Sequence, residues 1–169
     1  NREGREDVER MSSTLAQAQQ EVVDEFAMLS DWQDRYEQLI EQGRDLPLIA
    51  PEHKLDENLV RGCQSRVWLH AELQDAALST LSLPKGEGQN YAHNASTIHF
   101  TADSDALITK GIVALLVRVY NDRTPQEILG ASTEFIDRIG LREHLSPNRA
   151  NGLSAMIDQM KRYALAFSR

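Results

Sequence analysis

The residue with the most evident chemistry in this sequence is its single cysteine, Cys63. It follows Gly62 and lies between Arg61 and Arg66, where a polar stretch gives way to an alternating strand pattern. A free cysteine is either a small buried hydrophobe or a nucleophile that reacts as its thiolate. Gly62 permits unusual backbone angles or the close approach of another group, and the two arginines could favour a thiolate. These features alone leave both interpretations open.

The cysteine count and the histidine positions exclude several other chemistries. One cysteine cannot form an internal disulfide, a Cys-x-x-Cys zinc site or a dithiol redox pair. Five histidines are scattered along the chain, and none stands in a recognisable general-base motif. His70 and His99 occupy matching positions on two predicted strands and could be neighbours, but half-exposed strand histidines are the commoner case. We therefore expect no metal site.

Length, composition and charge bound the class of protein. A chain of 169 residues with 41% hydrophobic and 26% charged residues is one folded domain, or one domain with an appendage. Its net charge of -8 argues against nucleic-acid binding, which requires clustered Lys and Arg. No apolar run approaches the roughly 18 residues of a membrane span. The charged first residues lack a hydrophobic signal core, so we expect a cytoplasmic protein that does not bind a membrane.

Apolar residues recur at helical spacing toward both ends of the chain. The pattern predicts a helix from about residue 12 to 29 and a second one that is capped by Ser30 and ends at Gly43. Three later helices are predicted: a nearly enclosed one over 103–120 capped by Asp103 or Ser104, and two that start at Thr124-Pro125 and Ser146-Pro147.

The middle of the chain alternates apolar and polar residues, as β-strands do. Strands are predicted over 66–74, 77–83 and 96–102, with a turn-rich loop over 84–94. Residues 44–58 contain two prolines and are predicted to be an extended connection. The fold class is therefore α+β, with a small antiparallel sheet of about three strands flanked by helices.

Five motifs, in the same order along the chain, resemble the SufE family of sulfur-acceptor proteins. The run Gly62-Cys63-Gln64-Ser65-Arg66-Val67-Trp68 is similar to that family's Gly-Cys-Gln-Ser-x-Val-Trp signature. The other four lie within residues 32–47, 102–111, 124–128 and 145–153, the last containing Ser146-Pro147-Asn148-Arg149. The resemblance covers residues 26 to 168 and implies a SufE/IscU-like fold.

The resemblance implies a covalent sulfur carrier. In this family Cys63 would accept persulfide sulfur from a SufS-type cysteine desulfurase, stimulate its turnover and pass the sulfur to the Fe–S scaffold complex. No cofactor of its own is implied, because the pyridoxal phosphate belongs to the desulfurase.

The same resemblance suggests roles for the residues around Cys63. Gly62, Gln64, Ser65 and Arg66 would shape the loop, and Trp68 would anchor it to the sheet. Arg149 would organise the site or dock the desulfurase, with a solvated helix-surface role equally plausible. Asp105 is expected to be a simple helix cap.

Two segments depart from the family pattern. Residues 1–25 are expected to form an N-terminal extension, partly helical, ahead of a SufE-like domain over 26–169. The segment over 75–94 is longer than the short hairpin expected for the family.

Two other functions stay open at the level of the sequence. Cys63 could form a sulfenate in a one-cysteine redox enzyme or sensor. Alternatively, Cys63 could be structural in a non-catalytic adaptor that binds its partner through the acidic helical surface.

Overall fold

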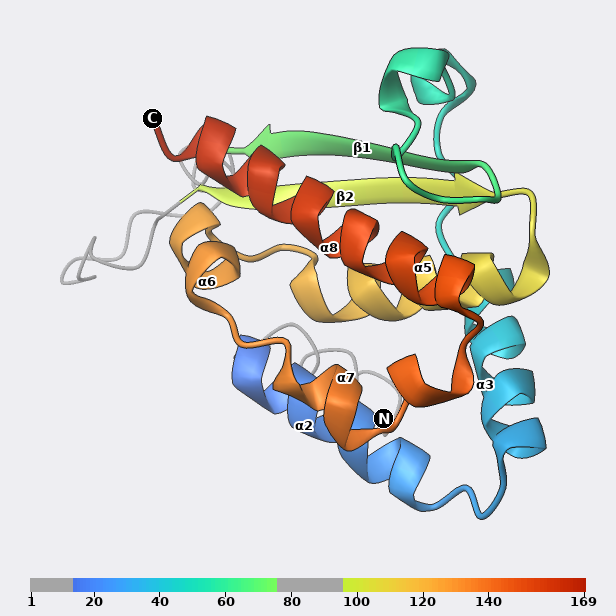
Figure 1. Ribbon diagram of the computed structural model, residues 1–169. Coiled ribbons are helices and arrows are strands. Elements are labelled where there is room, and N and C mark those ends of the chain that lie inside the picture. The colour runs from blue at the N-terminus through green and yellow to red at the C-terminus, as the bar shows by residue number, and fades with distance from the viewer. Residues whose placement is uncertain (1–13, 76–95) are drawn as a thin grey trace, which may run out of the picture.

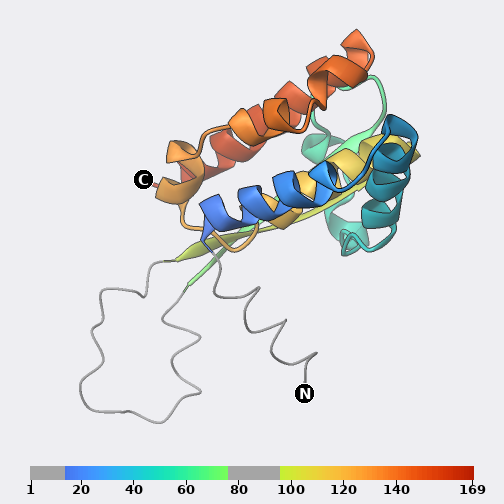
Figure 2. The ribbon, with the colours of Figure 1, turned by 90° about the horizontal axis from the view of Figure 1, so that it is seen from below.

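The computed structural model describes residues 14–75 and 96–169. The sheet has two strands in the described residues, and Figures 1 and 2 show the helices gathered on one of its faces. In chain order the helices and strands are α2 (Leu15–Ala27), α3 (Trp32–Arg44), β1 (Val67–Gln74), β2 (Thr97–Ser104), α5 (Leu107–Tyr120), α6 (Pro125–Gly130), α7 (Glu134–Arg138) and α8 (Pro147–Phe167). Short 3-10 turns η1 (Pro51–His53), η2 (Asp56–Asn58) and η5 (Arg142–His144) lie between them.

The sheet consists of β1 and β2, paired antiparallel from Val67 opposite Ser104 to Gln74 opposite Thr97. Alternation places Leu69 and Phe100 on the inner face, where both are buried. The α+β class is confirmed, but the expectation of about three strands is wrong for the described residues, whose sheet has two. The strand and the loop predicted over 77–83 and 84–94 lie outside these residues.

Helix α5 is the centre of the helical layer, as its nearly continuous apolar sequence predicts. It packs against α3, β2, α2 and α8. The crossing with α3 is very close, because a Cβ atom built on Gly111 would lie 2.2 Å from the backbone oxygen of Leu39. Gly43 faces the same crossing from inside α3, which ends at Arg44 with Asp45 as its C-cap. The prediction that Gly43 ends this helix is therefore wrong.

The helix starts show which capping predictions hold. Thr124 accepts a hydrogen bond from the Glu127 N–H, and Ser146 accepts one from Arg149, as predicted. The second helix, however, is capped by Asp31 rather than Ser30. Helix α5 begins after Ala106, because Asp103 and Ser104 still belong to β2.

Helix α2 is an integral part of the packing. Leu15, Val22 and Phe26 are buried, and the helix contacts α5 and α7. The Arg118 guanidinium of α5 donates to both carboxylate oxygens of Glu25, each at 2.7 Å. The boundary expected between residues 25 and 26 thus falls inside this helix. Within residues 14–75 and 96–169, no helix combines the length and the hydrophobicity that crossing a membrane requires.

Candidate functional site around Cys63

Cys63 lies in a loop formed by residues 61–66, directly before β1. The Val60 N–H donates to the Val67 carbonyl at 2.8 Å, which closes the base of this loop. Leu59 and Trp68 extend the closure as an antiparallel bridge. Val60 and Val67 are both buried, so the base is fixed in the core while the loop projects from it.

Gly62 is required here for two reasons. Its φ is 98°, in the left-handed region that favours glycine. In addition, a Cβ atom at this position would lie 3.3 Å from the Cβ of Ala155 in α8. The structure thus contains both features expected from the sequence, an unusual backbone angle and a close approach.

The Cys63 thiol is half-buried against the first turns of α8. Its Sγ donates to the Gly152 carbonyl oxygen at 3.6 Å. A Cβ atom on Gly152 would lie only 3.3 Å from this sulfur, so the glycine makes room for it. Burial raises the pKa of the Cys63 thiol, which is opposite to the effect expected from Arg61 and Arg66.

A small cavity of about 70 Å³ opens beside the sulfur. That volume holds several water-sized groups, and an added sulfur atom is of that size. Its lining comes from the Cys63 loop, α5 and α8: Cys63, Gln64, Ser65, Thr109, Ile112, Asn148, Arg149, Gly152 and Met156. The sulfur thus has a space beside it that both polar and apolar side chains line.

Two side-chain contacts hold the loop to its neighbours. Asn148 at the start of α8 donates to the Gln64 side-chain oxygen at 3.2 Å. At the other end of the loop, the Arg66 N–H donates to the Asp105 carboxylate at 3.1 Å. Asp105 does not cap α5, whose N-cap is Ala106. The expectation of a simple helix cap is therefore wrong, and Asp105 instead fixes the end of the loop.

Trp68 is buried at the start of β1, opposite Asp103. The Lys54 ammonium lies 4.5 Å from the centre of the Trp68 ring and 3.0 Å from the Asp103 carboxylate. A cation in this position is attracted by the partial negative charge on the face of the neutral aromatic ring. Trp68 therefore sits at the base of the loop, under Lys54, rather than on the cavity wall.

The predicted site residues separate into two groups. Gln64, Ser65 and Arg149 line the cavity with Cys63, and Arg149 is exposed in the first turn of α8. Arg66 and Trp68 lie at the base of the loop. Sequence reasoning did not single out the remaining lining residues, although Asn148 and Gly152 belong to the motif at 145–153. Ile112 and Met156 belong to the apolar residues that the sequence predicts to be core, and Thr109 lies in the same helix as Ile112.

The histidine pair considered in the sequence does not form. His70 lies diagonally from His99, because His70 pairs with Thr101 and Glu72 pairs with His99 across the sheet. His99 contacts Asp122 at 2.9 Å instead.

Comparison with known proteins identifies relatives over most of the chain. Residues 20–84 and 89–164 match the model of the SufE family, described as an Fe-S metabolism associated domain. The gap at 85–88 falls within the segment expected to be longer than in the family. In fold, the chain is similar to a hypothetical protein from Thermus thermophilus whose structure was solved in solution. Their TM-score is 0.62 at 21% identity, covering 88% of this chain and 96% of that one.

Two curated relatives are similar in sequence. An uncharacterized SufE-like protein of Rhizobium etli is 35% identical over 145 residues, 85% of this chain and 87% of the relative. A second, from Synechocystis, is 33% identical over 156 residues, 92% of this chain and 86% of the relative. Because the family model matches most of the chain, the Cys63 loop included, the chain belongs to the SufE family.

Proposed function

We propose that this protein accepts persulfide sulfur on Cys63 from a SufS-type cysteine desulfurase and passes it to the Fe–S cluster assembly machinery. Membership of the SufE family supports a role in Fe–S metabolism. The observation that carries the proposal is the position of Cys63, which lies in a projecting loop beside a cavity with room for one more sulfur. The acceptor needs no cofactor for this reaction.

The transfer is an exchange at sulfur. The Cys63 thiolate attacks the outer sulfur of the donor's persulfide, and a new S–S bond forms as the donor's S–S bond breaks. The donor cysteine leaves as a thiolate, so electrons balance without an external oxidant or reductant. The proton lost from Cys63 is available to the departing donor thiolate. Repetition of this step to a downstream acceptor returns Cys63 to its thiol.

The resting site is suited to holding sulfur rather than to reacting freely. Burial raises the pKa of the Cys63 thiol, so the resting protein holds mostly the unreactive thiol. Redox-sensing cysteines have a lowered pKa, whereas burial raises the pKa of the Cys63 thiol. Docking of the desulfurase is therefore expected to move the loop and release the thiol.

Mass spectrometry tests the transfer directly. The protein is incubated with a cysteine desulfurase and isotopically labelled cysteine, and its mass is measured with and without Cys63→Ala. We expect a gain of one labelled sulfur that is absent in the variant, together with faster desulfurase turnover. Peroxide reduction without sulfur transfer would favour the redox function. Desulfurase binding that persists in Cys63→Ala, with neither protein modified, would favour the adaptor.

Gly152→Ala tests the space around the sulfur. Alanine favours a helix interior over glycine by about 1 kcal/mol, so the substitution should not unfold α8. Its Cβ atom would lie 3.3 Å from the Cys63 sulfur, so we expect slower sulfur acceptance with an unchanged or raised melting temperature. Gly130→Ala is the matched control, since a Cβ atom there has nothing within 4 Å. Equal transfer rates for the two variants would contradict a role of this space in holding the sulfur.

A further inference from the structure

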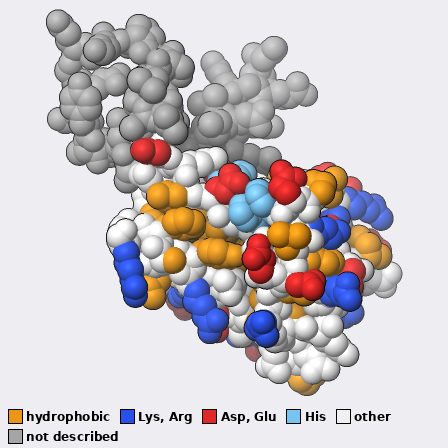
Figure 3. Space-filling view, turned by 90° about the horizontal axis from the view of Figure 1, so that it is seen from above, with side chains coloured by type: hydrophobic (Ala, Val, Ile, Leu, Met, Phe, Trp, Pro, Cys, Tyr) orange, Lys and Arg blue, Asp and Glu red, His pale blue; other side chains and the backbone are white. Residues whose placement is uncertain are grey.

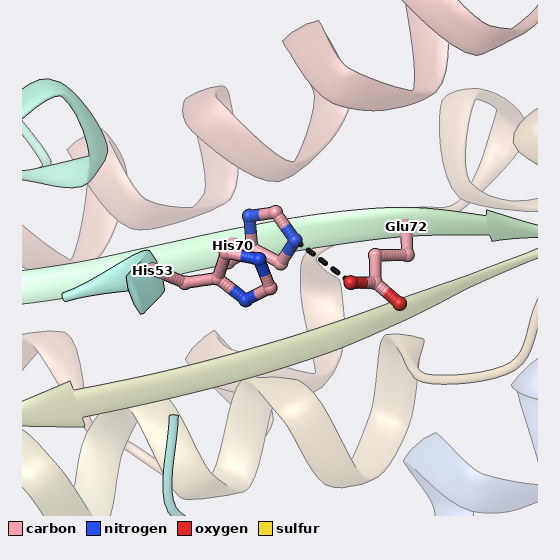
Figure 4. Close-up of side chains that lie close together, drawn as sticks. All are labelled: His53, His70 and Glu72. Atoms are coloured by element: carbon pink, nitrogen blue, oxygen red, sulfur yellow. Dashed lines mark hydrogen bonds and ion pairs between the residues drawn. The ribbon is translucent and has the colours of Figure 1, made fainter. Parts of the chain in front are cut away.

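A cluster of potential metal ligands lies on the outer face of β1, away from the Cys63 cavity. His53, His70 and Glu72 each offer a ligand atom, and these atoms all lie within 4.8 Å of one another. Figure 4 shows the three side chains converging, the histidine rings one over the other and the Glu72 carboxylate beside them. This cluster is separate from the residues that line the sulfur site.

The backbone explains why these three residues meet. His70 and Glu72 are two residues apart on β1 and therefore point to the same face of the sheet. Leu69 and Ala71 point the other way, into the core, while the His70 side chain lies on the outer face and is 21% exposed. Figure 3 shows histidine and acidic side chains lying side by side on the surface seen from above.

His53 comes to this face on a short, well-held turn. It ends η1, where its N–H donates to the Ala50 carbonyl at 2.9 Å. Its own carbonyl accepts from the Asn58 side chain at 2.6 Å. The His53 ring then stacks on His70, with ring centres 3.6 Å apart and planes 13° apart. The turn thus holds His53 over β1 without help from a ligand.

Among the cluster residues one, Glu72, is acidic, and a lysine follows His53 directly in the chain. Lys54, the nearest cation along the chain, has its ammonium 3.0 Å from the Asp103 carboxylate and over the Trp68 ring. The Asp103 carboxylate also pairs with the Lys110 ammonium at 3.3 Å, so it balances only part of the Lys54 charge. Glu72 contributes a negative charge, with its oxygen 3.1 Å from Nε2 of His70.

We propose that His53, His70 and Glu72 bind a divalent transition-metal ion such as Zn²⁺. Two imidazoles and one carboxylate form a donor set that Zn²⁺ accepts, with a fourth position left to water. At about 2.1 Å from each ligand, a tetrahedral ion needs its ligand atoms roughly 3.4 Å apart. The distance of 3.1 Å between Nε2 of His70 and Oε1 of Glu72 is near this value. To bind one ion, the stacked rings must tilt so that each imidazole nitrogen binds in the plane of its own ring.

Zinc titration of the full chain tests this site. The protein, free of any histidine tag, carries Cys63→Ser so that the thiol cannot bind the metal. We expect one Zn²⁺ per chain by calorimetry and a higher melting temperature with zinc than without. His53→Ala and His70→Ala should each weaken binding by about tenfold or more, and Glu72→Gln should weaken it measurably.

His99→Ala is the matched control, because His99 lies on the same face of the sheet but contacts Asp122 instead. It should bind zinc as the parent does. Co²⁺ provides a second readout, since a four-coordinate site gives intense visible absorption that His53→Ala should abolish. His53 lies in a 3-10 turn at the surface, so its variant should fold even where a change in β1 does not. Several weakly bound ions, or equal affinity in His53→Ala and the parent, would overturn the proposal.

Discussion

At the scale of single residues, the surroundings of Cys63 decide its chemistry. The neighbouring arginines suggest an activated thiolate, but the sulfur is turned into the protein and donates to the Gly152 carbonyl. Burial disfavours the charged form and raises the thiol pKa. The resting thiol is thus partly shielded, which suits the proposed role as a sulfur carrier.

The raised pKa predicts how alkylation of Cys63 depends on pH. In the native protein the rate with iodoacetamide should rise with pH and reach half of its maximum above the ordinary thiol value of about 8.5. In the urea-unfolded chain the midpoint should lie at the ordinary value. Alkylation reactions that are quenched at set times and analysed by mass spectrometry give the rate against pH for the native and the unfolded chain. A native midpoint below that of the unfolded chain would contradict the assignment.

The same shift has a consequence for stability, with a definite sign. Because the folded-state pKa is the higher one, the unfolded chain loses its proton first as pH rises. The contribution of the buried thiol is therefore complete below about pH 8.5 and is lost as pH rises toward the folded-state pKa. Urea titrations measure this effect: as pH rises above about 8.5, the free energy of unfolding of the wild type should fall relative to that of Cys63→Ser.

At the scale of elements, the α3–α5 crossing fixes the framework around the site. Gly111 and Gly43 let the two helix backbones approach, and α5 then carries Thr109 and Ile112 to the cavity wall. The sequence shows two glycines in helical segments, which are usually unfavourable there. Close packing of the backbones explains why glycine is needed at both positions.

Gly111→Ala should therefore be strongly destabilising. Its Cβ atom would lie 2.2 Å from the Leu39 backbone oxygen, which no side-chain rotation can relieve. We expect a loss of about 3 kcal/mol in the free energy of unfolding, from strain that forces the helices apart. Gly130→Ala in α6 is the control and should change stability by less than about 0.5 kcal/mol. Equal unfolding curves for the two variants would show that the crossing is looser than described.

At the scale of the whole molecule, α2 joins the N-terminal part of the chain to the core. Its apolar side covers α5 and α7, and Glu25 pairs with Arg118 through both carboxylate oxygens. The Arg118 side chain is 28% exposed and Glu25 37%, so this pair is better shielded than an ordinary surface ion pair. The family match, which begins at residue 20, starts inside the same helix.

Glu25→Ala should weaken this attachment, and Glu21→Ala provides the matched control. Both remove one negative charge from α2, but Glu21 lies 3.9 Å from Arg118 and is 50% exposed. We expect Glu25→Ala to cost about 1 kcal/mol and Glu21→Ala much less. The difference should shrink in 1 M salt, where the charges are screened over about 3 Å. A difference that does not respond to salt would point to packing rather than charge.

The sequence by itself determined the local features of this protein. The periodicity of apolar residues identified the α+β class, β1, β2 and the buried helix α5. Thr124 and Ser146 identified two helix starts, because capping depends on a few neighbouring residues. Five motifs in the same order along the chain identified the SufE family, and the motif around Cys63 predicts the reactive residue. These features depend on short runs of sequence, so no tertiary information was needed.

Tertiary structure alone decided the contacts between distant segments. Asp105 fixes the loop end rather than capping α5, and Gly152 makes room for the sulfur, because strands and helices far apart in sequence meet there. The direction of the Cys63 pKa shift follows from burial, which charges nearby in sequence do not reveal. Likewise, His70 meets His53 rather than His99, since a 3-10 turn folds over β1 and the strand register offsets the expected partner.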